Sequence, residues 1–390
     1  MSYMLKSLFE RENEMENIKS LLENLEAKRD YQLNMLIGLD GFVDEIVHIV
    51  DERMDSENYT RIPTIADYGK RINKGAGLST NIELVPVQVK LGGNGPNLAN
   101  ALLEYEVSLT YVGALGKPSI HPVFGEMATK AKEVHSLCAP AHTDAYEFED
   151  GKIIVSKLAS FKEMTWELLK ERLGGAEGIA KIIDENDLFG LENWTMVPYM
   201  SEIWEGIIHE VFPLLIEKEK KPYVFFDLAD PEKRTREDIQ YAMELISRFE
   251  EKFYTILGLN EKETFEIAGA LGLEFADEGE GRLKAATMAI YEKLKIHCLV
   301  IHPVRSASCV IDGEYYFTEG PYCEKPKLTT GAGDNFNAGF LLGTCIGLEP
   351  DLALTLGVCT SGFYVRNGHS PSYSQVMEFA RGWALGELGD

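Results

Sequence analysis

The sequence predicts an α/β fold in which a doubly wound, mostly parallel sheet is flanked by helices and capped by a small antiparallel β-sheet lid. Two observations lead to this prediction. From residue 33 onward, short apolar runs alternate with amphipathic stretches, and a few extended segments interrupt that alternation. Strands that alternate with helices form right-handed crossovers and parallel sheets, which bind ligands at the carboxyl ends of their strands. Residues that directly follow a strand are therefore the first candidates for a site.

Six apolar runs have the length of buried strands and are too short for helices. They are Asn34–Leu39, Leu109–Val112, Thr195–Pro198, Tyr223–Asp227, Tyr254–Leu257 and His297–Ile301. Stretches with an apolar residue every three to four positions lie between and after these runs, as expected for helices that cover a sheet. The predicted helices are Ser201–Glu217, Arg236–Glu250, Gly281–Leu294 and Asp351–Tyr364.

The predicted lid comes from three parts of the chain, at about 45–54, 83–91 and 144–157. The first two are extended segments that flank a short helical stretch, Ile65–Ile72. The third is divided by Asp150-Gly151, a dipeptide typical of hairpin turns. These strands lie outside the parallel pattern, so we expect a separate antiparallel sheet over the crevice of the main sheet.

The first 30 residues differ from the rest, so we predict an N-terminal helical extension at 1–30 and a single α/β domain at 31–390. Leu8, Met15 and Leu22 are seven residues apart, as are Ile18 and Leu25, on a strongly charged background. This spacing indicates a helix. It either packs on the body of the protein or forms a short coiled coil, which would make a homodimer. Fewer than three heptads is weak evidence for the coiled coil.

Charge and composition exclude several classes of partner. The chain has 38 Lys and Arg against 63 Asp and Glu, a formal net charge of −25. Nucleic acids and anionic membranes bind basic surfaces, so we expect neither as a partner. No run approaches the roughly 20 apolar residues of a membrane span, and the start of the chain does not resemble a signal peptide. Six cysteines without a CxxC pair favour a reduced, cytoplasmic setting.

The segment from Lys327 to Gly343 has the features of a phosphate-binding loop, because two glycines are followed at once by a helix. The N–H groups of Gly331, Ala332 and Gly333 would converge at the positive end of the helix dipole and form an anion hole. Asp334 would repel a phosphate there unless it is a base that takes a hydroxyl proton as the phosphoryl group moves to that oxygen. A capped turn without catalytic function is the structural alternative.

A second glycine-rich segment runs from Leu91 to Ala101. Gly93 and its glycine neighbours allow a ligand to approach the backbone closely, and a helix follows. Asn94 and Asn97 supply the neutral donors and acceptors that recognise sugar hydroxyls. A glycine-rich helix start without a ligand explains this segment equally well.

Two carboxylates follow the first predicted strand, at the place where the crevice should lie. Asp40 and Asp44 there can bind vicinal hydroxyls of a substrate, or one of them can cap the turn. Their spacing does not decide between these roles.

Asn260 and Glu263 follow another predicted strand. Asn260 suits the N-cap of a helix and Glu263 its capping-box partner. The functional alternative is that both residues organise water around Mg²⁺ and the nucleotide phosphates.

Several common motifs are absent from the sequence. It has no GxxxxGK[ST], which excludes Walker-type NTPases, and no GxGxxG, which counts against dinucleotide-binding dehydrogenases. It also lacks GxSxG and HExxH, the motifs of common serine hydrolases and zincins. The eight histidines show no spacing of metal ligands, and an isolated histidine such as His302 is expected to be structural.

Taken together and in this order, these segments resemble the ribokinase-like (PfkB) carbohydrate kinase family. The resemblance is carried by Gly92 to Asn97, by Asn260 to Glu263, and by Thr329 to Asp334, the last of which is close to the family's C-terminal signature. It covers roughly residues 33 to 385. It implies transfer of the γ-phosphoryl group of ATP, with Mg²⁺, to a hydroxyl of a sugar or nucleoside.

The resemblance also assigns roles to residues. It makes Asp334 the base, the Gly331–Gly333 amides the anion hole, and Glu263 a Mg²⁺ ligand that acts through water. The implied substrate-binding residues are Asp44, Asp40, Gly93, Asn94 and Asn97. The implied nucleotide-binding residues are Asn260, Glu263, Arg305, Thr330, Asn367 and Gly368.

The chain departs from the family at two places. The family often has a Thr-x-Gly stretch after the strand that leads to the nucleotide, where this chain has His302-Pro303-Val304, although Arg305 nearby can reach a phosphate. Ribokinase has an aspartate six residues before the base that helps to bind a monovalent cation, and here that position is Leu328. We therefore expect no ribokinase-type potassium site, or a modified one.

Three alternatives to a sugar kinase remain open at the level of sequence. A nucleoside kinase would share the same motifs. A sugar- or nucleotide-binding regulator without catalysis would share the same fold, although the intact Gly-Ala-Gly-Asp sequence disfavours it. A scaffold acting through the N-terminal helix is the weakest alternative.

Overall fold

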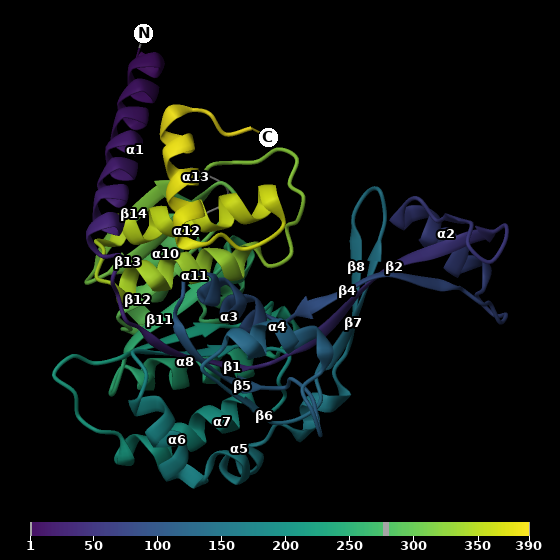
Figure 1. Ribbon diagram of the computed structural model, residues 1–390, viewed down its shortest axis with the longest axis horizontal. Coiled ribbons are helices and arrows are strands. Elements are labelled where there is room, and N and C mark those ends of the chain that lie inside the picture. The colour runs from purple at the N-terminus through teal and green to yellow at the C-terminus, as the bar shows by residue number, and fades with distance from the viewer. Residues whose placement is uncertain (1, 276–280, 390) are drawn as a thin grey trace.

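The protein, described by a computed structural model, is an α/β domain built on one large sheet, from which a small sheet projects to one side (Figure 1). The structure describes residues 2–275 and 281–389, and their side chains from residue 15 onward. The strands of the large sheet are β1 (Asn34–Leu39), β5 (Ser108–Gly113), β6 (Glu133–Ser136), β9 (Leu188–Glu192), β10 (Tyr223–Asp227), β11 (Tyr254–Leu259), β12 (Cys298–Ile301), β13 (Ser306–Ile311) and β14 (Glu314–Glu319).

Over the described residues the order of this nine-stranded sheet is β14-β13-β12-β11-β10-β9-β1-β5-β6. The seven strands from β12 to β6 are parallel to their neighbours, and β13 and β14 add an antiparallel edge. The strand order reverses beside β1, since β1 pairs with β5 on one side and with β9 on the other. Parallel sheets bind ligands in the crevice at such a reversal. The predicted fold class is confirmed.

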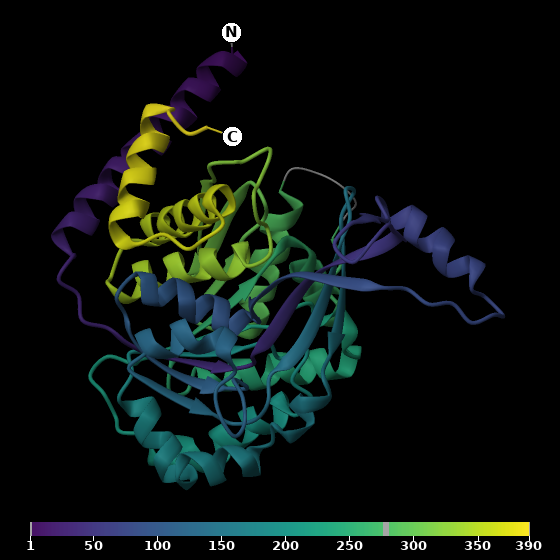
Figure 2. The ribbon, with the colours of Figure 1, turned by 45° about the vertical axis from the view of Figure 1, so that its right-hand side comes forward.

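Helices cover both faces of the large sheet (Figures 1 and 2). One layer contains α3 (Asn94–Glu104), α4 (Gly125–Lys130), α11 (Ala332–Cys345), α12 (Pro350–Asn367) and α13 (Tyr373–Leu385). The other contains α5 (Trp166–Leu173), α6 (Gly175–Asp184), α7 (Met200–Gly206), α8 (Arg236–Phe249), α9 (Glu261–Ala270) and α10 (Arg282–Leu294). Alternate residues of β1 enter alternate cores: Met35 and Ile37 face the first layer, and Leu36 faces the second.

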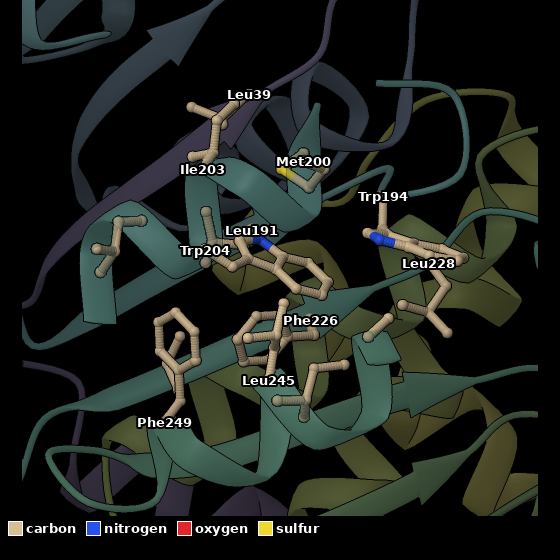
Figure 3. Close-up of a cluster of buried hydrophobic side chains, with 14 of the residues drawn as sticks. Leu39, Leu191, Trp194, Met200, Ile203, Trp204, Phe226, Leu228, Leu245 and Phe249 are labelled. Carbon is tan, nitrogen blue, oxygen red and sulfur yellow. The ribbon is translucent and has the colours of Figure 1, made fainter. Parts of the chain in front are cut away.

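The core under the second layer is rich in aromatic side chains. In Figure 3 the Trp204 indole from α7 lies over Phe226 of β10, and Phe249 of α8 lies beside Phe226. The ring centroids of Trp204 and Phe226 are 4.9 Å apart and those of Phe226 and Phe249 are 5.0 Å apart, both edge to face. Such pairs add about 0.5–1.5 kcal/mol each beyond the burial of their area. This packing fixes β10, whose last residue is Asp227.

The small sheet forms the projection at the right of Figure 1, and we call it the lid. Its strands are β2 (Phe42–Arg53), β3 (Tyr59–Arg61), β4 (Leu84–Gly92), β7 (Ala141–Glu147) and β8 (Lys152–Lys157), and α2 (Ile65–Lys74) packs beside it. The predicted segments are confirmed as strands. Pairings of β2 with β3 and β4, and of β7 with β8, are antiparallel as predicted, but β2 pairs with β7 in parallel.

The N-terminal helix α1 (Ser2–Ala27) runs beside α13 in both views (Figures 1 and 2). Ile18, Leu21 and Leu25 are buried in the core under α12 and α13, and the Tyr373 hydroxyl donates a hydrogen bond to the Leu25 carbonyl at 2.7 Å. Packing on the body, one of the two predicted alternatives, is therefore observed for this part of the helix. Met15 is exposed, and Leu8 lies outside the side chains that the structure describes.

One predicted strand is wrong. Thr195–Pro198 is a turn, and the strand at this place is β9, which ends three residues earlier at Glu192. The run around Thr195 is buried because Val197 and Trp194 pack in the core below the sheet, so apolarity alone does not mark a strand there. The predicted helix Ser201–Glu217 is also shorter, because the α-helix ends at Gly206. A π-helical turn (Ile207–Val211) and a 3-10 turn (Phe212–Leu214) follow it.

Among the described residues, no helix has the length and apolarity needed to cross a membrane.

Candidate active site

A cavity of about 320 Å³ lies between the lid and the carboxyl ends of the large sheet, and we call it the first cavity. Its lining includes Asp44, Gly93, Asn94, Asn97, Asn260, Glu263, Thr330, Gly331, Gly333 and Asp334, all of which the sequence singled out. Segments from across the whole chain therefore meet at one place. The crevice beside β1 is where the fold class leads one to expect a site.

The lid contributes one wall of the first cavity through neighbouring strands. Lys90, Asp44, Thr143 and Ser156 follow one another in register across β4, β2, β7 and β8, and all four line the cavity. Burial raises the pKa of Asp44, while the charge of Lys90 and a hydrogen bond with Thr143 oppose that rise. This wall thus presents a carboxyl, an ammonium and two hydroxyls to a ligand.

The position of Asp44 depends on Gly92, its near neighbour on β4. A Cβ at Gly92 would stand 2.3 Å from the carboxyl of Asp44, closer than atoms can approach. Any other residue there would displace the carboxyl from the cavity wall.

Asp40 does not line the cavity but holds the start of α3. Its carboxyl is fully buried and accepts hydrogen bonds from the N–H groups of Asn94 at 3.1 Å and Gly95 at 2.9 Å, and from the Asn193 side chain at 2.7 Å. Burial raises the pKa of Asp40 to about 6, and these hydrogen bonds oppose the rise. Of the two carboxylates considered after the first strand, Asp40 caps a helix and Asp44 faces the cavity.

Asn94 and Asn97 lie on the first turns of α3, which begins after Gly93. Gly93 has a φ of +98°, a conformation that favours glycine. The Asn94 amide donates to the carboxylate of Asp227 at 3.2 Å, and the other oxygen of Asp227 accepts from Asn337 at 3.1 Å. Asp227 thereby links the start of α3, the end of β10 and the first turns of α11.

Asp334 lies on the first turn of α11, with 7% of its surface exposed, and it faces the first cavity. Burial raises the pKa of Asp334 to about 8, hydrogen bonding from Asn97 opposes the rise, and the negative charges of Asp40 and Glu263 add to it. The carboxyl is held where a proton could be taken from a group inside the cavity.

The loop before Asp334 has the geometry of a helix N-terminus with partly free donors. Gly331 is the N-cap of α11 with a φ of +91°, and the Tyr364 hydroxyl fixes the loop by donating to the Thr330 carbonyl at 2.7 Å. The N–H of Ala332 already donates to the Thr329 carbonyl at 3.1 Å. Within the described residues no protein acceptor is found for the N–H groups of Gly331 and Gly333, so these two are available to an anion.

The predicted capping box at the start of α9 is present. Asn260 accepts from the Glu263 N–H at 3.0 Å, and the Glu263 carboxylate accepts from the Asn260 N–H at 2.9 Å. The second oxygen of Glu263 accepts from the N–H of Asp230 at 2.9 Å. Burial raises the pKa of Glu263. Both residues still line the first cavity, so the structural role does not remove them from the site.

Carboxyl oxygens are the ligands that Mg²⁺ prefers. Asp227, Glu263 and Asp334 are three buried carboxyls in the wall of one cavity, where a divalent cation would neutralise their charge, but they are not among the groups close enough together to ligate one ion directly. Elsewhere in the described chain, Asp230, Glu232 and Glu266 lie close enough together to hold a metal. There Lys262 already supplies the positive charge, with its ammonium 2.7 Å from Asp230 and 2.8 Å from Glu232.

A second cavity of about 360 Å³ adjoins the first and lies over α11 and α12. Its lining is mostly apolar or small and includes Pro303, Val304, Tyr322, Ala332 and Val358. A mostly apolar cavity beside a helix N-terminus fits a nucleotide, with the base among the apolar side chains and the phosphates at the helix.

Three residues considered for nucleotide binding lie outside both cavity linings. The Arg305 guanidinium stacks on Tyr322, 3.5 Å from the ring centroid. Asn367 donates its amide to the Phe363 carbonyl at 2.9 Å, and Gly368 ends α12 with a φ of +78°. Only the Tyr322 contact brings one of them, Arg305, to the edge of the second cavity.

Sequence reasoning missed four charged or amide side chains of the first cavity, besides the hydroxyls of Thr143 and Ser156. Asp227 ends a strand that was correctly predicted, so the rule of inspecting strand ends would have found it. Asn193 follows β9, the strand that was not predicted. Lys90 and Lys152 lie on lid strands, where alternation alone does not show which face meets the ligand.

A lidded α/β domain with a buried carboxyl on a glycine-capped helix, facing a polar cavity, has the architecture of a ribokinase-like carbohydrate kinase. Residues 12–383 match the family model of the prokaryotic ketohexokinases, and the chain belongs to this family. It is thus an ATP-dependent sugar kinase. The family match does not favour the nucleoside kinase considered from the sequence.

Known proteins similar to this chain agree with that assignment. A ketohexokinase from Haloferax volcanii is 28% identical over 367 residues, which cover 94% of each chain. Among solved structures, a ribokinase from Thermotoga maritima has a TM-score of 0.61 at 18% identity and covers 90% of this chain and all of its own. A mutant phosphofructokinase-2 from Escherichia coli has a TM-score of 0.60 at 14% identity, with 91% of this chain and 99% of its own covered. These structures show the shared fold.

Proposed function

We propose that this kinase transfers the γ-phosphoryl group of ATP to a hydroxyl of a ketohexose, with Asp334 as the base. The observation that supports this most is the position of Asp334, buried on the first turn of α11 and facing a cavity walled by polar lid residues. The ketohexose comes from the names of the matched family and of the relative in Haloferax volcanii.

In the proposed reaction the Asp334 carboxylate accepts the proton of the sugar hydroxyl. That oxygen forms a bond to the γ-phosphorus while the bond to the oxygen bridging the β- and γ-phosphates breaks, and its electron pair leaves with ADP. The N–H groups of Gly331 and Gly333, and to a lesser degree the already bonded Ala332, hold the phosphoryl at the helix N-terminus. Placing base and acceptor in one cavity contributes to the rate by orientation.

Mg²⁺, when bound, neutralises charge on the nucleotide phosphates. We propose that Glu263 holds the ion through water and that Asn260 and Thr330 contact the nucleotide. Arg305, whose guanidinium stacks on Tyr322 at the edge of the second cavity, is proposed to contact a phosphate. Asn367 and Gly368 are proposed as residues at the outer edge of the nucleotide site, near α12.

Acceptor binding is assigned to the lid and to α3. We propose that Asp44 and Lys90 contact sugar hydroxyls from the lid, and that Gly93, Asn94 and Asn97 contact them from the start of α3. Asp40 would act indirectly, because its carboxyl holds the N–H groups that open α3.

Chain organisation, compartment and assembly are part of the same proposal. We propose an extension at 1–30 on a kinase domain at 31–390, in a cytoplasmic compartment, since the six cysteines include no CxxC pair. A homodimer stays a prediction. Measuring the mass in solution of the full chain and of a chain lacking residues 1–30 tests both the extension and the dimer.

The test of the function is an assay of ADP release with Mg²⁺ and ATP over ketohexoses, aldohexoses, sugar phosphates and nucleosides. We expect the highest kcat/KM with a ketohexose. A preference for nucleosides would contradict the proposal. Absence of turnover on every acceptor, with ATP still bound, would instead indicate a regulator without catalysis.

A further inference from the structure

Three residues belong to the walls of both cavities: Asn260, His302 and Gly333. In the proposed reaction the acceptor occupies the first cavity and the nucleotide the second. The transferring phosphoryl group must then pass the place where the two cavities join. Side chains at this junction are the ones that can contact it directly.

The junction is poor in positive charge. Among the described residues that line the second cavity there is no lysine or arginine, and the lysines of the first cavity, Lys90 and Lys152, come from lid strands. Asp227, Glu263 and Asp334 on the sugar side add negative charge when they are ionised. A phosphoryl group at the junction therefore depends on neutral hydrogen-bond donors of the protein, in addition to any metal ion.

His302 is held in place at this junction. It is the first residue after β12, and its backbone N–H donates to the Leu259 carbonyl at 3.0 Å. Its ring lies against Phe336, with 5.1 Å between ring centroids. A Cβ at Gly333 would lie 3.0 Å from Cε1 of His302, so the ring stands directly beside the backbone of the anion hole.

Burial keeps the imidazole neutral, since it lowers the pKa of His302 to about 4. A neutral imidazole carries one N–H donor, and an anion next to the ring favours the tautomer that directs this donor toward it. Asn260, the other side chain at the junction, already uses its oxygen to cap α9. The ring of His302 and the amide N–H groups of Asn260 are thus the two neutral side-chain donors at the junction.

We propose that the imidazole of His302 donates a hydrogen bond to the γ-phosphoryl group of the nucleotide during transfer. This proposal rests on the proposed function. It also gives a role to the segment in which the chain departs from the Thr-x-Gly stretch, because His302 is the first residue of that departure. The competing explanation is that His302 only packs against Phe336, as expected of an isolated histidine.

The two explanations predict different effects of a His302 substitution on the binding of ADP and on the binding of ATP. The test measures, by calorimetry with Mg²⁺, the binding of ADP and of a non-hydrolysable ATP analogue to the parent, to His302→Phe and to His302→Asn. Phe keeps an aromatic ring against Phe336 and lacks the donor, whereas Asn keeps a donor. His297→Phe is the matched control, because its ring packs on Tyr254, 4.6 Å between centroids, and lines neither cavity.

We expect His302→Phe to weaken binding of the ATP analogue about 10-fold or more, the effect of losing a hydrogen bond to a charged group. ADP binding should change less than about 2-fold, and His302→Asn should recover part of the loss. Equal losses for ADP and the analogue, or no loss at all, would overturn the role of His302. A parent that neither binds the analogue nor phosphorylates any sugar would overturn the proposed function itself.

Discussion

Asp44 on β2 and Lys90 on β4 are register partners across an antiparallel pair, and both side chains line the first cavity. Each alters the ionisation of the other: the lysine opposes the rise that burial imposes on the pKa of Asp44, and the carboxylate opposes the fall that burial imposes on the pKa of Lys90. The pair therefore brings opposite charges to the lid wall, where hydroxyls of an acceptor can bridge them.

Replacing Asp44 with Asn should weaken binding of the sugar acceptor without weakening binding of the nucleotide. A hydrogen bond to a charged group contributes about 1.5–3 kcal/mol, so we expect the KM for the sugar to rise roughly 10- to 100-fold. The KM for ATP should stay within about 2-fold. Steady-state kinetics with each substrate varied in turn measures both.

Asp144→Asn is the matched control for that change. Asp144 is the next residue of β7 after Thr143, pairs with the exposed Lys157 at 2.7 Å, and lines neither cavity. The Asp144→Asn substitution should leave the KM for the sugar and the KM for ATP unchanged. An equal loss in the two variants would show that any charge change in the lid impairs the enzyme.

Replacing Glu263 with Gln should raise the concentration of Mg²⁺ needed for half-maximal activity. Gln keeps the size and one oxygen, so the hydrogen bond from the Asn260 N–H can persist, while the charge offered to the ion and the bond from the Asp230 N–H are lost. A titration of activity with Mg²⁺ after chelation measures the shift. Glu261→Gln, two residues earlier and exposed, should leave the titration unchanged, and matching shifts would remove Glu263 from the metal site.

The rate should depend on pH through Asp334. The base acts only when ionised, and burial raises the pKa of Asp334 to about 8 in the protein without ligands. Because kcat/KM reports the free enzyme, it should rise with pH and level off above about 8. A profile that is flat between about pH 6 and 9, measured with saturating Mg²⁺, would contradict this assignment.

The free energy of unfolding should depend on pH in the opposite direction and fall as the pH rises. The pKa of Asp334 is raised from 3.8 to about 8, so its favourable contribution is fully present below 3.8 and is lost as the pH rises toward 8. Asp334→Asn cannot ionise and avoids this loss. We expect the variant to be more stable than the parent by on the order of a few kcal/mol at pH 8 and by little at pH 4. Denaturant unfolding at both pH values measures the difference.

The fold could be predicted because its signals are local. Strands buried on both faces, such as β1 and β10, appear as short continuous apolar runs, and the predicted bounds of both match the structure. The failure at Thr195–Pro198 has a physical cause, since a buried turn and a buried strand share the same apolar composition. The parallel pairing of β2 with β7 depends on tertiary contacts and has no local signal.

The candidate site was predictable where backbone geometry demands a particular residue. Glycines at 331 and 93, each with a positive φ, mark the two helix starts that line the first cavity. Side chains brought in by distant strands were not predictable in the same way. Lys90 faces the ligand because of the lid register, and His302 matters because β12 delivers it beside Gly333.

The central claim is that Asp334 is the base, and turnover by Asp334→Asn tests it most directly. The measurement compares kcat of the parent and the variant on a verified sugar, alongside binding of the non-hydrolysable ATP analogue. General-base catalysis contributes about 10²- to 10⁴-fold, so we predict a loss of kcat of at least 100-fold with analogue binding within a few-fold of the parent. Full turnover by the variant would contradict the account.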